Sequence, residues 1–339
     1  MYESLPGAVG SPPEHYGNPL GEQKALAAGA AVVDLSDRGV VTITGADRLR
    51  LLDSLTSQSL AGLKPGESTE TLQLDPNGRV ELAMRVVDDG ETTWLLVDGD
   101  QVEGVRGWFE RMRFMMQVEI LDRSAEFATV GSFGLPVTGA TVTWTDPWAS
   151  VTRGGHQYAD ASHAYEWTYT ESLVPREALV AQPAAGTTAL EALRIAAWRP
   201  RLATEVDERS IPHELDWLRS AVHLSKGCYR GQETVAKVHN LGHPPRRLVL
   251  LHLDGVTPPV GSDVLLGDKE VGTVTSSALH YELGPIALAV IKRSVDPAAD
   301  LVVPVEGELV AAAQEIIVPP SAGSVADIPR IPRLGAVQR

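Results

Sequence analysis

The sequence predicts an α+β protein of two or three domains that ends in a small β-barrel. The chain has 339 residues, which exceeds the size at which a single hydrophobic core usually stops growing. Its first part alternates strand patterns with apolar helical faces. After residue 245, short strand patterns are separated by glycine and proline turns, as in small all-β barrels.

The first 120 residues predict short strands, two helices and a β-meander. Residues 32–44 alternate apolar and polar side chains and predict strands. Asp47 is a candidate cap for a helix whose apolar face carries Leu49, Leu52 and Leu55. The meander comprises residues 71–74, 80–87 and 93–97, joined by Asp75-Pro76-Asn77-Gly78 and Asp88-Asp89-Gly90. Residues 101–112 predict a second helix, with Val102, Val105 and Phe109 as its apolar stripe.

The middle of the chain predicts further strands and two helices. Residues 123–183 contain short strand patterns rich in glycine, threonine and tryptophan. Thr188 and Glu191 have the spacing of a capping box, which predicts a helix that ends before Pro200 and carries Leu190, Leu193 and Ala197 on one face. Another helix is expected after Pro212, with Leu215, Leu218 and Val222 on one face.

His243-Pro244-Pro245 is a natural linker to the barrel. The barrel is expected over residues 245–318, with strands at 247–253, 263–266, 271–276 and 286–291. The two ends of the chain, residues 1–19 and 319–339, are rich in proline or glycine and lack apolar periodicity. They are therefore expected to form arms outside the core.

Composition excludes several classes of protein. The formal net charge of −15 disfavours nucleic-acid binding, which depends on neutralising phosphates. No apolar run is long enough to span a bilayer, and the first residues do not have the order of a secretory signal, so a cytoplasmic protein without membrane partners is expected. The sequence contains no P-loop, no dinucleotide-binding glycine motif and no esterase nucleophile elbow.

The only cysteine of the chain lies in an unusual segment. This octet reads Lys226-Gly227-Cys228-Tyr229-Arg230-Gly231-Gln232-Glu233. Flanking glycines allow a tight turn, and the two cations would favour the nucleophilic thiolate. The alternative is that Cys228 is a small buried apolar residue, as free cysteines often are. Gln232 and Glu233 could orient the loop through its backbone, or Glu233 could pair with Lys226.

Two patterns in and after the octet are candidate ligand sites. Residues 226–247 contain one acid, Glu233, and five basic residues: Lys226, Arg230, Lys237, Arg246 and Arg247. This local excess of positive charge suits either an anionic ligand or a solvated basic loop. His239 and His243 are four residues apart, but Gly242 and Pro244 disfavour a helix that would present both as ligands, so no metal site is expected. Asp34 and Ser36 could line a cavity or simply cap a turn.

The octet matches the K-G-C-[FY]-x-G-Q-E motif of the YgfZ family of folate-binding proteins. That family resembles the T-protein, the aminomethyltransferase of the glycine cleavage system, and is implicated in making or maintaining iron–sulfur clusters. Further segments resemble landmarks of the T-protein family. They are Thr44-Gly45-Ala46-Asp47, Ala192-Leu193-Arg194-Ile195 with the downstream Asp207-Glu208 and Ile211-Pro212, and residues 271–276. The resemblance implies a three-domain T-protein-like cloverleaf, with residues 20–244 as two interleaved α+β domains bounded near 120 and 188.

The resemblance also implies a ligand and a role. The expected ligand is tetrahydrofolate or a derivative, with Arg194, Trp198, Glu81 and Lys237 as its contacts. Cys228 and Lys226 are the expected reactive residues, and iron–sulfur proteins are possible clients.

Two positions argue against aminomethyl transfer. The catalytic aspartate of T-proteins falls on Ala83, and the glutamate that holds the pterin falls on Ala196. Glu81 shares a strand face with Ala83 and could substitute, or it could be a solvated strand residue. With these two departures from the T-protein pattern, the resemblance to the YgfZ family implies a folate-binding protein of iron–sulfur cluster assembly or repair. A tetrahydrofolate-dependent aminomethyltransferase and a non-catalytic partner-docking module are the alternatives.

Overall fold

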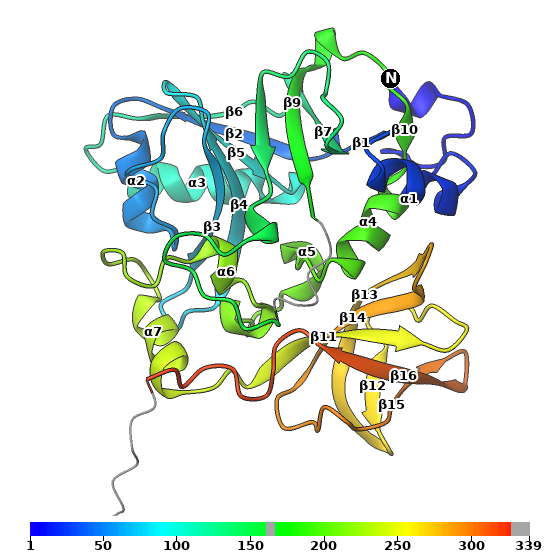
Figure 1. The fold of residues 1–339 in the computed structure, drawn as a ribbon. Coiled ribbons are helices and arrows are strands. Elements are labelled where there is room, and N and C mark those ends of the chain that lie inside the picture. Colours follow the sequence, from blue (N-terminus) through cyan, green and yellow to red (C-terminus); the bar gives the residue numbers. More distant parts are fainter. Residues whose placement is uncertain (161–166, 327–339) are drawn as a thin grey trace, which may run out of the picture.

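The computed structural model describes residues 1–160 and 167–326. These residues form two five-stranded sheets and a closed six-stranded barrel, with helices around them. The sheets occupy the upper part of the molecule and the barrel the lower right (Figure 1). The predicted α+β class with a C-terminal barrel is confirmed.

The first sheet has the order β3-β4-β5-β2-β6 and is antiparallel throughout. Its strands are β2 (Gly39–Thr44), β3 (Ser68–Leu74), β4 (Val80–Asp88), β5 (Thr92–Val97) and β6 (Glu119–Asp122). The predicted meander is present, and its turns use the expected chemistry. Gly78 and Gly90 have φ angles of +78° and +103°, and the Asp75 carboxylate accepts hydrogen bonds from the Asn77 and Arg79 amides.

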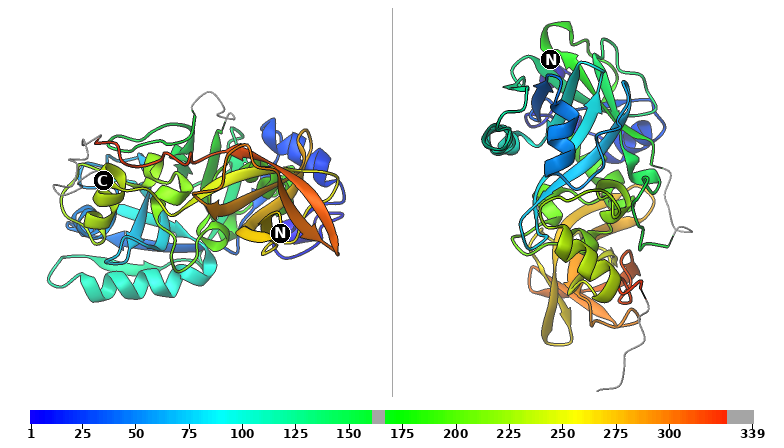
Figure 2. Two further views of the ribbon diagram at one scale, coloured as in Figure 1. Left: turned by 90° about the horizontal axis from the view of Figure 1, so that it is seen from below. Right: turned by 90° about the vertical axis from the view of Figure 1, so that its left-hand side faces the viewer.

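Two helices cover the outer face of this sheet, α2 (Arg48–Leu55) and α3 (Val102–Met112). Figure 2 shows α3 on the outside of the molecule, away from the barrel. Helix α2 buries Leu51 and Leu52, and Leu55 packs partly buried against the same core, so the prediction was right for Leu52 and Leu55 but missed Leu51. In α3 the buried residues include Val105 and Phe109, as predicted, and also Trp108.

The second sheet has the order β10-β1-β7-β9-β8, in which only the β1–β10 pair is parallel. Its strands are β1 (Val32–Asp34), β7 (Phe127–Phe133), β8 (Val142–Thr145), β9 (Tyr169–Pro175) and β10 (Ala184–Ala185). Helices α1 (Pro19–Ala27) and α4 (Thr187–Ala196) pack against each other beside it (Figure 1). The inner faces of both sheets share one hydrophobic core.

Several local predictions about helices were wrong. The capping box does not form, because Thr188 donates to the Glu14 carbonyl and Glu191 pairs with Arg194. The helix expected after Pro212 is broken at Asp216, whose φ is +54°. Helix α7 (Gln232–Leu241) was not predicted from the sequence. This helix ends before His243. The remaining short helices are η1 (Tyr2–Ser4), η2 (Gly99–Gln101), η3 (Pro147–Ala149), η5 (Arg176–Ala178), α5 (Leu202–Glu205), η6 (Pro212–Leu215) and α6 (Leu218–Ala221).

The barrel closes in the order β11-β14-β13-β12-β15-β16. Its strands are β11 (Arg246–Leu253), β12 (Asp263–Leu266), β13 (Lys269–His280), β14 (Gly284–Lys292), β15 (Leu301–Val305) and β16 (Glu308–Ile316). Four of them were predicted. The last two were missed because β15 contains Pro304 and β16 contains three alanines, residues that are depleted in strands.

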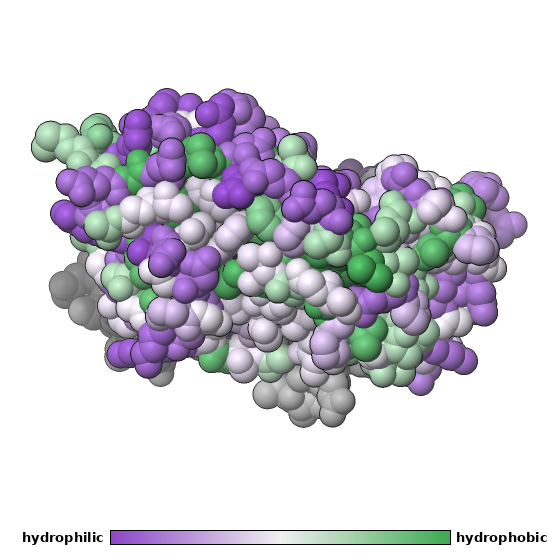
Figure 3. Space-filling model, turned by 90° about the horizontal axis from the view of Figure 1, so that it is seen from above, coloured by the Kyte–Doolittle hydropathy of each residue, from purple (hydrophilic) through white to green (hydrophobic). Residues whose placement is uncertain are grey.

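The two ends do not form free arms within the described residues. Tyr2 is fully buried, and the Thr187 amide donates to the Pro13 carbonyl, so the N-terminal residues pack on the start of α4. At the other end, the Val325 amide donates to the His239 carbonyl on α7. Hydrophilic side chains cover much of the face seen from above (Figure 3). In the parts that the structure describes, no helix has the length and apolar character needed to cross a membrane.

Candidate functional site

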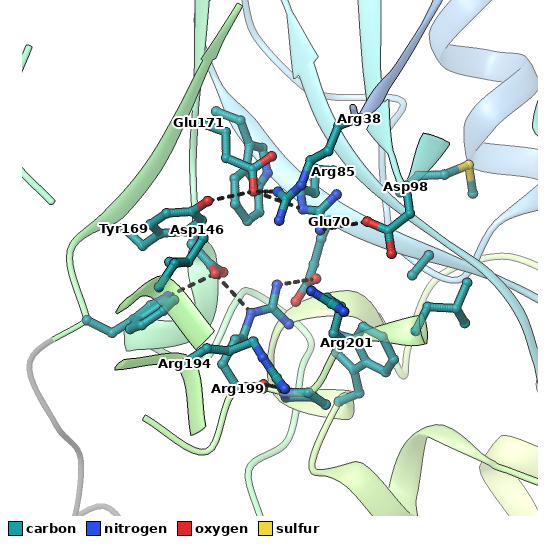
Figure 4. Close-up of a pocket in the computed structure, with 18 residues that line it drawn as sticks. Arg38, Glu70, Arg85, Asp98, Asp146, Tyr169, Glu171, Arg194, Arg199 and Arg201 are labelled. Atoms are coloured by element: carbon teal, nitrogen blue, oxygen red, sulfur yellow. Dashed lines mark hydrogen bonds and ion pairs between the residues drawn. The ribbon is translucent and has the colours of Figure 1, made fainter. Parts of the chain in front are cut away.

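A narrow central cavity lies between the inner faces of the two sheets and the segment that follows α4. Its free volume is about 50 Å³, enough for a few water molecules. Nine charged side chains line it, five arginines and four carboxylates (Figure 4). They are Arg38, Arg85, Arg194, Arg199, Arg201, Glu70, Asp98, Asp146 and Glu171.

One group of charges centres on Glu171 of β9. Its carboxylate pairs with Arg38, lies 3.3 Å from Arg85 and accepts a hydrogen bond of 3.1 Å from the Tyr169 hydroxyl. Burial alone would raise the pKa of Glu171, but the two guanidinium groups lower it below its usual value. Burial and the adjacent carboxylate raise the pKa of Tyr169 well above normal. Glu171 is therefore held as a buried carboxylate.

A second group centres on Arg199, which follows α4. Its guanidinium lies 2.7 Å from Glu70 of β3 and 2.9 Å from Asp146. Asp146 also accepts a hydrogen bond of 2.8 Å from the Trp167 indole. Burial raises the pKa of Asp146 although Arg199 opposes the shift. This group joins both sheets across the cavity.

Arg194 connects the cavity to the barrel. It projects from α4, pairs with Glu191 and lies 2.9 Å from Glu205. It also donates a hydrogen bond of 2.6 Å to the hydroxyl of Ser276 on barrel strand β13. The Arg194 guanidinium is thus engaged by Glu191, Glu205 and Ser276, and the residue braces the cavity wall.

Several buried polar atoms of the lining have no hydrogen-bond partner among the described residues. These atoms are Glu70 Oε1, Glu171 Oε2, Arg199 Nη1, Arg201 Nε and Trp217 Nε1. A buried polar atom without a partner costs on the order of 1–3 kcal/mol. Water or a ligand that supplies both donors and acceptors would remove that cost. The set offers two acceptors and three donors to such a molecule.

Beside the cavity lies a wider hollow, the mouth, of about 620 Å³, which is within the usual range for ligand pockets. Five residues line both spaces: Arg38, Asp98, Leu190, Arg194 and Arg201. Ser11, Pro12 and Glu14 of the N-terminal segment form part of the mouth. The packed N-terminus is thus one wall of the entrance.

The two alanines singled out in the sequence lie on different hollows. Ala83 of β4 lines the central cavity. Ala196 lines a separate hollow of about 350 Å³ beside the barrel, together with Phe133 and Tyr281. Trp167 contributes to both hollows and packs edge-on against Phe133, with 5.0 Å between ring centroids. The Trp167 side chain therefore separates the two positions.

The Cys228 loop lies outside the residues that line the cavity and its mouth, and Cys228 is exposed. The loop rests on the β3–β4 turn. A side chain on Gly231, whose φ is +85°, would lie 2.6 Å from the Asp75 carbonyl oxygen, so glycine is required there. Gly227 has open space around it and no positive φ, so the expected close approach is confined to Gly231.

Lys226 is turned away from solvent toward the end of α2. Its ammonium group donates to the carbonyl oxygens of Thr56 at 2.9 Å and Gln58 at 2.6 Å. It also contacts Asp53, through the carbonyl at 2.5 Å and the carboxylate at 3.5 Å. Burial lowers the pKa of Lys226, and Asp53 opposes this shift. In the described structure the carboxylate partner of Lys226 is Asp53, whereas Glu233 is exposed in the first turn of α7.

The rest of the octet stiffens the loop. Gln232 donates a hydrogen bond of 3.2 Å to the Lys226 carbonyl, which closes the turn as expected. Tyr229 is buried, with the Lys226 ammonium 5.5 Å from its ring centroid. Arg230 lies 3.2 Å from Glu81, which also accepts a hydrogen bond from Gln73. Glu81 thus faces the octet and is outside the cavity lining.

The basic residues of 226–247 do not gather into one patch. Arg246 pairs with Asp207 at 2.6 Å and with Glu214 at 2.8 Å. Arg247 is buried and donates to Gln314 at 2.7 Å. Lys237 is exposed on α7. Of the two alternatives that the sequence left open, a focused patch for an anionic ligand does not form, because each arginine is neutralised or buried locally.

The other candidates lie apart from the cavity. Trp198, with φ of +59°, lines a small hollow beside Trp148 and Arg219. Asp34 accepts a hydrogen bond from the Ser36 amide, and burial raises its pKa. His239 contacts the Tyr158 hydroxyl at 3.1 Å, and His243 contacts the Ala322 carbonyl. Within residues 1–160 and 167–326, no group of histidine, cysteine and carboxylate side chains could hold a metal ion.

Sequence reasoning missed most of the cavity. Glu70, Asp146, Glu171 and Arg199 come from four distant segments, so no motif joins them. A weak signal was available, since Glu70 and Glu171 interrupt otherwise strand-like runs at positions that prove to be buried.

Comparisons with known proteins agree with this architecture. Residues 246–319 match the glycine cleavage T-protein C-terminal barrel domain. A putative chloroplastic transferase of Arabidopsis thaliana is 26% identical over 76% of this chain, which spans 65% of that relative, just under two thirds of its length. An aminomethyltransferase of Moorella thermoacetica is 26% identical, with 82% of this chain and 83% of the relative covered.

Two further similarities bear on role and fold. The mitochondrial iron–sulfur cluster assembly factor IBA57 homologue of Mycosarcoma maydis is 24% identical over 66% of this chain and 57% of that protein. The crystal structure of the glycine cleavage aminomethyltransferase T of Bartonella henselae has a TM-score of 0.69 and 16% identity, covering 93% of this chain and 91% of that one.

Proposed function

We propose that this chain, a relative of the glycine cleavage T-proteins, binds a tetrahydrofolate-type ligand in its central cavity and acts in iron–sulfur cluster assembly or repair. The observation that carries the ligand proposal is the set of five buried polar atoms without partners around the cavity. They include acceptors and donors on facing elements. Such a set suits a planar heterocycle that carries both N–H groups and a carbonyl.

The chemistry of a reduced pterin matches that set. Its amino and ring N–H groups would donate to Glu70 and Glu171, which are carboxylates with one free oxygen each. Its carbonyl would accept from Arg199, whose Nη1 is free. The free volume of about 50 Å³ is smaller than a pterin, so lining side chains must move when the ligand enters.

The iron–sulfur role rests on two supports. One relative is named as an iron–sulfur cluster assembly factor. The other is the exposed thiol of Cys228, on a loop held at one end by Lys226 and at the other by Gly231. An exposed thiol on a rigid loop can react with, or ligate metal from, a partner that docks there. This function places the reactive thiol on the surface and the folate in the interior.

Calorimetric titration with tetrahydrofolate and 5-formyltetrahydrofolate tests the ligand proposal. We expect saturable binding that weakens about tenfold in Glu70→Gln, which replaces one carboxylate oxygen by an amide donor. The matched control is Glu91→Gln, an exposed glutamate at the β4–β5 turn. Absence of binding to the wild-type protein, or equal losses in both variants, would refute the cavity as a folate site.

Aminomethyl transfer is the second candidate, because relatives named aminomethyltransferase cover 82% of this chain. Against it, Ala83 stands on the cavity wall at the position that the resemblance assigns to the catalytic aspartate. Glycine-dependent formation of methylenetetrahydrofolate in a reconstituted system would support the transferase. Folate binding without turnover supports the proposed function, and neither activity would favour a partner-docking module.

A further inference from the structure

The mouth of the central cavity is lined by more carboxylates than arginines. The carboxylates are Glu14, Asp37, Asp98, Asp100 and Glu191, and the arginines are Arg38, Arg194 and Arg201. The lining therefore has a formal excess of two negative charges, and the chain as a whole carries −15.

Ion pairs engage the arginines of the mouth and also two of its carboxylates, Asp98 and Glu191; Asp98 lies 3.5 Å from Arg85. Arg38 is paired with Glu171, and Arg194 is paired both with Glu205 and with Glu191 of the mouth itself. Arg201 is the remaining arginine of the mouth, and it lies 3.8 Å from Glu191.

Three carboxylates of the mouth face solvent without compensation. Glu14, Asp37 and Asp100 are exposed, and none of them takes part in an ion pair within the described residues. They come from the N-terminal segment, the β1–β2 turn and the turn after β5. The packing between the last two turns is tight, because a side chain on Gly99 would lie 2.3 Å from the Asp37 carbonyl oxygen. The acidic rim is therefore held in place by the fold.

The mouth is the neighbouring hollow that has the largest part of its lining in common with the cavity, compared with the hollows beside Ala196 and Trp198. It has five lining residues in common with the cavity, whereas the hollows beside Ala196 and Trp198 each share only Trp167 with it. Glu70, Glu171, Arg199 and Trp217, all more than nine-tenths buried, carry polar atoms without a partner among the described residues, and these atoms favour a ligand in the cavity independently of the acidic rim.

We infer that the site selects folates with a short tail: the pterin enters the cavity, the glutamate tail leaves through the acidic mouth, and each further γ-linked glutamate weakens binding. This inference rests on the proposed function. Each added glutamate brings one more negative charge past Glu14, Asp37 and Asp100. The repulsion acts within a Debye length of about 10 Å at 0.1 M salt, so it depends on ionic strength.

The test compares tetrahydrofolate carrying one glutamate with tetrahydrofolate carrying five, by calorimetry at low and high salt. We expect the pentaglutamate to bind roughly fivefold more weakly at low ionic strength, and the difference to shrink at about 0.5 M salt as the charges are screened. In the double variant Asp37→Asn/Asp100→Asn, the low-salt difference should fall to about twofold or less. The control Glu308→Gln removes an exposed charge from the barrel and should leave the difference unchanged.

Equal or tighter binding of the pentaglutamate would overturn this inference while leaving folate binding intact. A preference for the short tail that persists in the double variant would also overturn it, because the acidic rim would not be the cause. If neither folate binds, the proposed function fails and this inference fails with it.

Discussion

The ammonium group of Lys226 donates a hydrogen bond of 2.6 Å to the carbonyl oxygen of Gln58. Together with the carbonyls of Asp53 and Thr56, this contact ties the Cys228 loop to the segment that follows α2. The cation that precedes Cys228 in the sequence is thus a structural anchor, and its donors are directed at backbone oxygens. The thiol is positioned by this anchor and by the Gly231 contact on the β3–β4 turn.

Replacing Lys226 by methionine should destabilise the fold. The change keeps most of the aliphatic stem but leaves three carbonyl acceptors without their donor, which should lower the free energy of unfolding by about 2–3 kcal/mol. Urea unfolding measures this, with Lys237→Met as the control at an exposed site on α7. A loss below about 0.5 kcal/mol would mean that the anchor does not stabilise the loop.

Cys228 should be alkylated in the folded protein without denaturant, because its side chain is exposed. Cys228→Ser should change the free energy of unfolding by less than about 0.5 kcal/mol, as expected for a surface substitution. It should also abolish support of iron–sulfur enzymes in cells that lack the wild-type protein, while folate binding is retained. Full support by the serine variant would show that the thiol has no part in the function.

Ala83→Asp should not create aminomethyltransferase activity. The new carboxylate would join four others around the cavity, and the second position, Ala196, lies beyond Trp167 on another hollow. We expect no glycine-dependent methylenetetrahydrofolate above background and a stability loss of about 2 kcal/mol from the added buried charge. The neutral, similarly sized Ala83→Asn should lose less. Activity in the single variant Ala83→Asp would support the aminomethyltransferase hypothesis.

His213 should make the protein sensitive to acid. Burial lowers its pKa to about 3, and the neighbouring His239 and His156 add to the shift, although its contact with the Val235 carbonyl opposes it. Above the unfolded pKa of about 6.5 the ring is neutral in both states, so its contribution to stability is complete there. As the pH falls from 6.5 toward 3, the unfolded chain takes up a proton that the folded one refuses, and stability is lost.

The variant His213→Gln isolates this effect, because other titrating groups are common to both proteins. Between pH 7.5 and pH 5.0, the stability of wild type relative to the variant should fall by roughly 2 kcal/mol. Urea unfolding at both pH values measures the difference. A constant difference would show that His213 titrates normally in the folded state.

Much of the fold could be predicted from local sequence patterns. The meander was predictable because Asp75, Gly78 and Gly90 specify turns through interactions with their own neighbours. Four barrel strands followed from alternation and glycine punctuation. The break at Asp216 was not predictable, because its carboxylate accepts a hydrogen bond of 2.6 Å from the Tyr158 amide, 58 residues away. The burial of Tyr2 likewise depends on distant elements.

The sequence by itself determined the fold class and the C-terminal barrel, and it singled out the Cys228 octet as a candidate site, since periodicity, turn chemistry and motif spacing are local properties of the chain. Only the tertiary structure decided where the charges act. It joined Glu70, Asp146 and Arg199 across two sheets, and it directed Lys226 into backbone carbonyls. Ion pairs and buried hydrogen bonds depend on distances of a few ångströms between segments far apart in the chain, and these distances exist only after the sheets have packed.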